Sequence, residues 1–300
     1  DIPDCVDSPP AGTIIITEVM QNPAQVNDAQ GEWFEVHNTS TSAIDLDGWT
    51  FSDNPGIFQQ SFEITTTLVV QPDDYIVLAR NADGSLNGGV TVDYEYGVAM
   101  ALGNSEDEIF MYTSSGLLMD SVAWDDGVTF PSPNGASMAL APGFLDGLLN
   151  DDGNNWCEST YSPWWWWGNR DPSTPGFASD DLNSDSDGDG VVDCVDDDSD
   201  NDGDPDETDC NDTDPNQFTG NPEVCDGLDN DCDGVIPTNE EDVDQDGFLA
   251  CVDCDDTLDS VFPFAPELCD GLDNDCDGSA NADAAGEVDA DGAASLSCED

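Results

Sequence analysis

The first 180 residues alternate between short apolar runs and turn-forming residues. The runs are rich in β-branched and aromatic side chains, and Gly, Pro, Asn and Asp separate them. No stretch shows the 3.6-residue period of an amphipathic helix, so the pattern predicts β-strands. We expect strands at residues 13–19, 32–37, 75–79, 108–112 and 117–124. About seven strands of this kind predict an all-β sandwich.

Several strings in this segment are similar to the motifs of one known family. They are residues 15–19 (IITEV), 32–38 (EWFEVHN), 44–53 (IDLDGWTFSD), 108–122 and 173–176 (STPG). Together they resemble the lamin tail domain over most of residues 12–180. The resemblance implies an immunoglobulin-like β-sandwich with a scaffolding or attachment role and no active site of its own. A fold by itself does not set a function.

Beyond residue 180 the apolar runs give way to an acidic repeat with a period of 44 residues. Residues 222–234 (PEVCDGLDNDCDG) recur as residues 266–278 (PELCDGLDNDCDG). The shift in composition predicts a boundary between a β domain at 1–180 and an irregular, disulfide-stapled region of calcium loops at 181–300. The repeats divide into residues 185–228, 229–272 and a partial third at 273–300.

Each repeat contains two D-x-D-x-D-G strings, which have the spacing of a calcium loop. Ca²⁺ takes about six to eight oxygen ligands: carboxylates at positions 1, 3 and 5, a carbonyl at 7 and a carboxylate at 12, around a turn that Gly at 6 permits. The predicted metal ligands of five loops, including acids at position 9 of the first two, are Asp185, Asp187, Asp189, Asp193, Asp196; Asp198, Asp200, Asp202, Asp206, Asp209; Asp229, Asp231, Asp233, Glu240; Asp242, Asp244, Asp246, Asp253; and Asp273, Asp275, Asp277.

The loops differ in how complete this ligand set is. The first two carry acids at positions 9 and 12 and are predicted to be the strongest sites, whereas the next two lack the acid at 9. The loop from Asp273 meets Ala284 at position 12, and a weaker sixth loop from Glu287 meets Cys298 there. We expect these last two loops to bind weakly.

The absence of helical patterns beside the loops argues against EF-hands. Loops that follow one another almost directly resemble thrombospondin type 3 repeats, whose calcium ions replace a hydrophobic core. The string CDGLDNDCDG also resembles the MopE-like metal-binding repeats of bacterial surface proteins, a family named after a copper binder. Copper favours His, Met and Cys ligands, and residues 181–300 contain no His or Met. Oxygen-only loops therefore predict several Ca²⁺ ions.

Charge narrows the range of partners. The chain has 69 acidic residues against Arg80, Arg170 and His37, and its net charge is −67. Nucleic acid, anionic membrane surfaces and phosphorylated substrates all require a basic patch, so we exclude them. A disordered acidic tail is the simpler alternative, but such a tail has no reason to keep a 44-residue register. No apolar run approaches the roughly 18 residues of a membrane span.

Eleven cysteines, nine of them from Cys194 to Cys298, predict a disulfide framework in an oxidising compartment. A thiolate zinc site is the alternative, but the one closely spaced pair has no matching second pair. A chain that starts at Asp1 fits an exported protein whose signal has been removed. The repeat register suggests bonds Cys5–Cys157, Cys210–Cys225, Cys232–Cys251, Cys254–Cys269 and Cys276–Cys298, with Cys194 left over.

Catalysis is not expected, because His37 has no partner for acid–base chemistry and no nucleophile motif is present. Four consecutive tryptophans at 164–167 cannot all face one core, so part of this run is expected to form an interface or stack on a glycan. We predict a secreted calcium-binding structural or adhesive protein that self-associates into a filament or surface layer. The alternative is a carbohydrate-binding or cell-surface attachment module of a larger exported protein.

Overall fold

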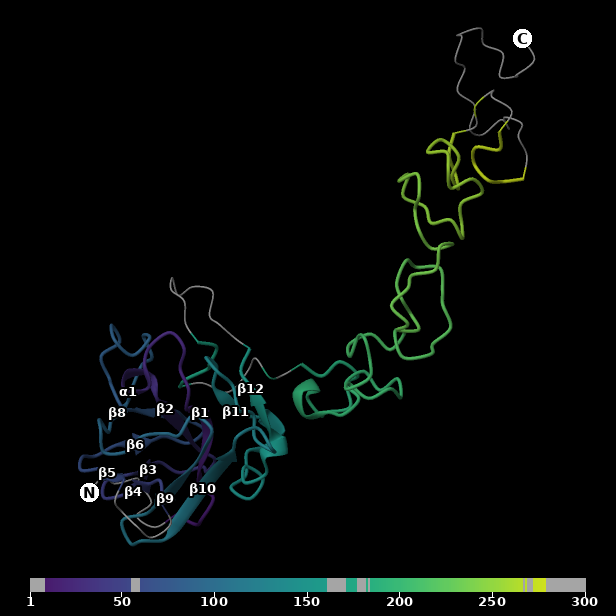
Figure 1. Ribbon diagram of the computed structural model, residues 1–300. Coiled ribbons are helices and arrows are strands. Elements are labelled where there is room, and N and C mark those ends of the chain that lie inside the picture. The colour runs from purple at the N-terminus through teal and green to yellow at the C-terminus, as the bar shows by residue number, and fades with distance from the viewer. Residues whose placement is uncertain are drawn as a thin grey trace. The chain divides into compact units, whose positions relative to one another are not determined.

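The computed structural model describes residues 9–54, 60–160, 171–176, 182, 184–266, 268 and 272–278. The chain divides into two compact units, Asp1–Asp196 and Asp197–Asp300. All helices and strands of the described residues lie in the first unit, and the described part of the second unit consists of turns and loops (Figure 1).

Two larger sheets and one two-stranded sheet form the described part of the first unit. The larger has the strand order β12-β11-β1-β2-β7-β8, the smaller has the order β10-β9-β4-β5, and β3 pairs with β6. Only β7 and β8 run parallel among the described pairs. The strands are β1 (Ile14–Met20), β2 (Trp33–Asn38), β3 (Ile44–Asp45), β4 (Thr50–Ser52), β5 (Ser61–Glu63), β6 (Val69–Val70), β7 (Tyr75–Ala79), β8 (Tyr94–Glu95), β9 (Glu106–Tyr112), β10 (Leu118–Asp125), β11 (Met138–Leu140) and β12 (Trp156–Glu158).

The five strands predicted from the sequence coincide with β1, β2, β7, β9 and β10, with ends that differ by one or two residues. The estimate of about seven strands was too low for the described residues. The seven additional strands are two or three residues long, which is too short to produce a periodic signal. Helical segments are equally short: α1 (Asp28–Gly31) and the 3-10 turns η1 (Pro142–Phe144), η2 (Gly153–Asn155) and η4 (Asp193–Val195).

Side chains from both sheets meet in one hydrophobic core. Phe34 of β2 and Phe51 of β4 are fully buried, with ring centroids 5.4 Å apart. Ile109 and Met111 of β9 join the same cluster. Burying one such side chain stabilises the fold by about 1.5–3 kcal/mol. The first unit is therefore the all-β sandwich that the sequence predicted.

All seven residues of β1 are buried, so the strand is covered on both faces. On the outer face two buried carboxylates, Glu18 and Glu35, hold the segment 171–176 against the sheet. The Thr174 N–H and hydroxyl donate to Glu18 at 2.9 and 3.1 Å, and the Gly176 N–H donates to Glu35 at 2.7 Å. Because buried carboxylates need donors, this turn and the two acids stabilise one another.

A third buried carboxylate connects the two sheets. Asp120 of β10 accepts from the Ile16 N–H of β1 at 2.7 Å and from the Asn150 side-chain amide at 2.8 Å. Burial raises the pKa of Asp120 to about 7, although these donors lower it. Burial likewise raises the pKa of Glu32 in the same sandwich to about 7, so both acids titrate near neutral pH.

His37 lies in β2 and is buried. Its ring stacks on Tyr75 with centroids 4.0 Å apart, and its Nδ1 lies 3.2 Å from the Asp74 carbonyl oxygen. Burial lowers the pKa of His37 below its usual value. These contacts give the imidazole a packing role within the sheet. Separately, the described helices include none with the length and apolar character to cross a membrane.

Candidate metal centre

The five D-x-D-x-D-G strings adopt one common turn. Position 6 is a glycine whose φ lies between +85° and +102° in every loop, from Gly190 to Gly278. Residues with a Cβ rarely adopt this left-handed conformation. A side chain would meet no atom within 4 Å at any of these glycines, so the backbone conformation, and not lack of space, accounts for glycine at this position.

Hydrogen bonds fix the acidic side chains in the same way in each loop. The N–H of the position-6 glycine donates to Oδ2 of position 1 at 2.8–3.2 Å in all five. The N–H of position 5 donates to Oδ1 of position 3 at 2.7–3.2 Å. In the first four loops the N–H of position 7 donates to Oδ1 of position 5. Backbone N–H groups thus orient the carboxylates at positions 1, 3 and 5 in the first four loops.

Position 4 is also left-handed, which the sequence analysis did not foresee. Gly188 occupies it in the first loop. The residues at this position in the other four loops have φ between +57° and +67°, and they are Asn201, Cys232, Gln245 and Cys276. Glycine and asparagine tolerate this conformation, but glutamine and cysteine adopt it rarely. The residue types at position 4 therefore gave little indication of a left-handed conformation there.

The carboxylates that the turn holds converge on one point. One oxygen from each of Asp185, Asp187 and Asp189 lies within 4.8 Å of the other two, and the triad at positions 1, 3 and 5 of the second loop is equally close. Burial raises the pKa of Asp200, and the charges of Asp202 and Asp209 raise it further. The arrangement therefore costs free energy through like-charge repulsion unless a cation occupies the centre.

Several carboxylate oxygens at these centres are buried and accept no hydrogen bond. They belong to positions 1, 3, 5 and 12: Oδ1 of Asp229 and Oδ2 of Asp200, Asp202, Asp244, Asp246 and Asp253. A buried carboxylate oxygen without a donor is strongly destabilising. A hard divalent cation would supply the missing interaction, because such ions take carboxylate and carbonyl oxygens. The residues present therefore fit an oxygen-bound metal ion.

Two of the predicted position-12 acids, Asp209 and Asp253, interact with other ligands of their loops. The charges of Asp209 and Asp253 act on the acids at positions 3 and 5, because they contribute to the raised pKa values of Asp200, Asp202 and Asp244. Glu240, at position 12 of the third loop, is 3 % exposed. Asp196 directly follows the 3-10 turn η4. Ion binding by all of these predicted ligands stays a prediction.

The acids at position 9 of the first two loops accept hydrogen bonds from position 2, and their binding of an ion stays a prediction. Asp193 accepts from the N–H and the hydroxyl of Ser186 at 2.8 and 3.0 Å. Asp206 accepts from the same two groups of Ser199, both at 2.8 Å. In both loops the position-9 carboxylate therefore holds the residue at position 2.

Two acids outside the loops make the same contact where position 9 is not acidic. Glu223 accepts from the N–H groups of Asn230 and Asp231 at 3.4 and 3.2 Å. Asp256 accepts from the Val243 N–H at 3.1 Å. Neither acid was predicted from the loop spacing, because Glu223 lies before position 1 of its loop and Asp256 lies after position 12 of its loop.

The disulfides correct the pairing that the repeat register suggested. The bonds are Cys157–Cys194, Cys210–Cys232, Cys225–Cys251 and Cys254–Cys276. The predicted bonds of Cys157, Cys210, Cys232, Cys254 and Cys276 were wrong, and Cys194 is not left over. The register gave no information on distance, whereas the left-handed turn at position 4 brings Cys232 within 5.8 Å of Cys210, measured between Cα atoms.

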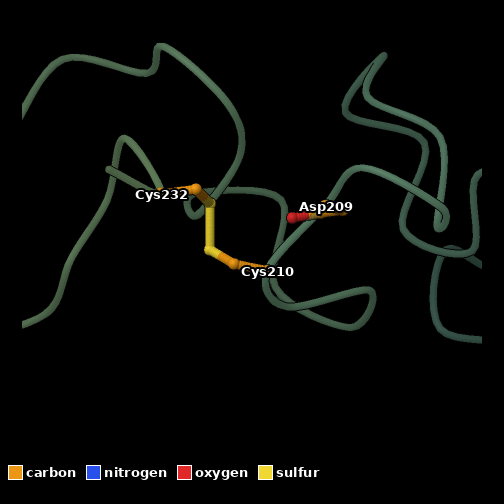
Figure 2. Close-up of side chains that lie close together, drawn as sticks. All are labelled: Asp209, Cys210 and Cys232. Carbon is orange, nitrogen blue, oxygen red and sulfur yellow. A yellow bond between two sulfur atoms is a disulfide. The ribbon is translucent and has the colours of Figure 1, made fainter. Parts of the chain in front are cut away.

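Figure 2 shows one consequence for the metal chemistry. Asp209, Cys210 and Cys232 lie close enough to resemble a mixed metal site, but the two sulfur atoms are bonded to each other. The same holds for Cys254 and Cys276 beside Asp253. Sulfur in a disulfide is not a thiolate ligand. These bonds also fit an oxidising, extracellular environment.

Two fully buried asparagines repeat with the period of 44 residues. Asn230 accepts from the Val224 N–H at 3.0 Å, and Asn274 accepts from the Leu268 N–H at 2.9 Å. The disulfides Cys210–Cys232 and Cys254–Cys276 are offset by the same period. The sequence repeat is therefore a structural repeat. The calls on Ala284, the loop from Glu287 and residues 164–167 lie outside the described residues, as do Cys5, Cys269 and Cys298.

Comparison with known families agrees with this division of the chain. Residues 7–126 match the family described as Lamin Tail Domain, an immunoglobulin-like fold. Residues 209–236 and 253–281 match the family described as "Putative metal-binding motif", of the MopE type. No curated protein matches the chain. The chain therefore consists of a first segment similar to the lamin tail domain and a later segment with two stretches similar to the MopE-type metal-binding motif.

Proposed function

We propose that this chain is a secreted, non-enzymatic structural protein whose acidic repeats bind Ca²⁺, and that the ions hold the repeats in one rigid conformation. The observation that carries the proposal is the set of buried carboxylate oxygens at positions 1, 3, 5 and 12 that accept no hydrogen bond. Five loops share one backbone conformation around these positions, which favours repeated binding of the same ion.

The donor set favours calcium over the other common ions. Copper would require imidazole, thioether or thiolate groups, and residues 181–300 have no His or Met. Magnesium keeps most of its water shell and uses one or two carboxylates, whereas calcium accepts dense carboxylate cages. Each loop offers at least three carboxylates, so the proposed ion is Ca²⁺.

Binding of Ca²⁺ would also explain how a region without an apolar core stays folded. Residues 197–266 include few buried apolar side chains, and Val261 and Ala265 are those with the lowest exposure. Loop-to-loop disulfides and ions then supply most of the stabilisation, and each ion offsets two negative charges. A chain with net charge −67 repels its own copies, so the proposed self-association into a filament or surface layer depends on calcium.

Removal of divalent ions from the full chain tests this proposal. With calcium we expect isothermal titration to show several bound ions, and we expect the repeats to resist limited proteolysis. With EGTA we expect rapid cleavage beyond residue 197 and a larger hydrodynamic radius, while the sandwich stays intact. Equal resistance and radius in both conditions would contradict calcium binding as the source of rigidity.

Assembly is tested separately by sedimentation and electron microscopy across a calcium titration. Filaments that form with calcium and dissolve in EGTA would support the structural role. A monomer at every calcium concentration would refute self-association and leave the calcium sites themselves in place.

A further inference from the structure

The amide of position 2 has a carboxylate acceptor in each of the first four loops. Asp193 and Asp206, both at position 9, supply it in the loops that begin at Asp185 and Asp198. This contact joins the two ends of the loop, because position 2 lies beside the first ligand and position 9 lies three residues before the last.

The next two loops cannot make this contact with position 9, which is Pro237 in one and Ala250 in the other. Glu223 lies six residues before the first of these loops, and Asp256 lies three residues after the end of the second. One acid reaches its loop from upstream and the other from downstream, yet both accept from the position-2 N–H.

Glu223 also lies close to the ion ligands of its loop. One of its carboxylate oxygens is within 4.8 Å of oxygens of Asp229 and Asp231. In that loop Oδ1 of Asp229 is buried and accepts no hydrogen bond. The loop held by Asp256 has three such oxygens, on Asp244, Asp246 and Asp253. Both centres therefore contain buried carboxylate oxygens that a divalent cation would bind, independently of Glu223 and Asp256.

We propose that Glu223 and Asp256 are positioning residues that take the place of the position-9 carboxylate and complete the third and fourth cation sites. The proposal rests on the divalent-cation function proposed above. When Glu223 and Asp256 are counted, each of the first four loops has five carboxylates that belong to it or accept a hydrogen bond from it. The third and fourth sites are then equivalent to the first two, and not weaker as position-by-position reading of the sequence predicts.

Acceptors behind metal ligands have measurable effects on affinity, because they orient the ligands and stabilise the charge of the site. Loss of such a residue typically lowers metal affinity about 10- to 100-fold. Substitution of Glu223 or Asp256 by its amide keeps the shape of the side chain while it removes the charge and the strong acceptor. We therefore expect Glu223→Gln and Asp256→Asn each to weaken one calcium site by about 10- to 100-fold.

The full chain is titrated with Ca²⁺ by isothermal calorimetry, with Glu241→Gln and Asp259→Asn as matched controls. Glu241 and Asp259 are exposed acids of the same repeats, so their variants remove one charge without the contact at position 2. Asp244→Asn serves as the reference for loss of a direct ligand. We expect one fewer tight ion with Glu223→Gln and with Asp256→Asn, and the full number with both controls.

Two further measurements separate positioning from a general folding defect. Excess calcium should restore the protease resistance of each variant, and Glu223→Asp should recover part of the affinity. Persistent protease sensitivity at saturating calcium would show a folding role and overturn the proposal.

The remaining outcomes distinguish this inference from the proposed function. If Asp244→Asn loses an ion while Glu223→Gln and Asp256→Asn match their controls, the positioning role is wrong and calcium binding stands. If the controls weaken binding as much as the test variants, the effect is one of total charge and the proposal is overturned. If the unaltered chain binds no calcium, both proposals fail.

Discussion

Replacement of Gly247 by alanine tests whether the turn conformation sets ion affinity. Gly247 has φ of +102°, and its N–H donates at 3.1 Å to Oδ2 of Asp242, the first ligand of the loop. An added methyl group would meet no atom within 4 Å. The cost of the substitution is therefore torsional, and a left-handed conformation costs a residue with a Cβ about 1–2 kcal/mol.

The ion-free loop can relax away from this conformation, but the ion-bound loop cannot. The torsional cost then subtracts from the free energy of binding, and about 1–2 kcal/mol corresponds to about 5- to 30-fold weaker calcium binding at that site. Titration calorimetry on the full chain measures this change. Loss of affinity should affect one ion, because the other loops keep their own glycines.

Gly116→Ala is the matched control, because Gly116 also has positive φ (+81°) and open space around it, in the turn between β9 and β10. It should lower the stability of the sandwich by a similar amount and leave calcium binding unchanged. Unchanged affinity in Gly247→Ala, or an equal loss of affinity in Gly116→Ala, would refute the argument that the left-handed turn orients the ligands.

Two predictions concern the sandwich. Because burial raises the pKa of Asp120 to about 7 in the folded state, its contribution to stability is present at low pH and is lost as pH rises through 7. Asp120→Asn should therefore flatten the pH dependence of the free energy of unfolding between pH 5 and 8 by on the order of 2 kcal/mol, as followed by near-UV circular dichroism. Thr174→Ala removes the hydroxyl that donates to Glu18 and should lower the stability by about 1–3 kcal/mol in denaturant titrations.

Each of these two predictions has its own contrary result. An unchanged pH slope in Asp120→Asn would show that another group titrates in this range. For Thr174, the exposed Thr66 supplies the control. If Thr66→Ala destabilises the protein as much as Thr174→Ala, the contact between residues 171–176 and the sheet contributes nothing specific.

The sequence by itself determined the longer strands and the acidic turns, because both depend on residues that are close together along the chain. Short apolar runs between turn-forming residues located β1, β2, β7, β9 and β10. The D-x-D-x-D-G spacing located the five turns. In this turn the aspartates accept from backbone N–H groups two to five residues away, and the turn requires the left-handed Gly at position 6. Such contacts involve neighbours in sequence, so the order of residue types is sufficient to predict them.

Partners distant in sequence were decided by the tertiary structure. The repeat register gave wrong disulfide partners, since the path of the chain, and not the spacing of cysteines, sets which sulfur atoms meet. Cys194 belongs to the first acidic loop but pairs with Cys157 of β12, so that loop lies in the compact unit of the sandwich. Glu223 and Asp256 reach their loops from opposite directions along the chain. An acid-rich sequence offers many carboxylates for each role, and only the fold selects among them by distance.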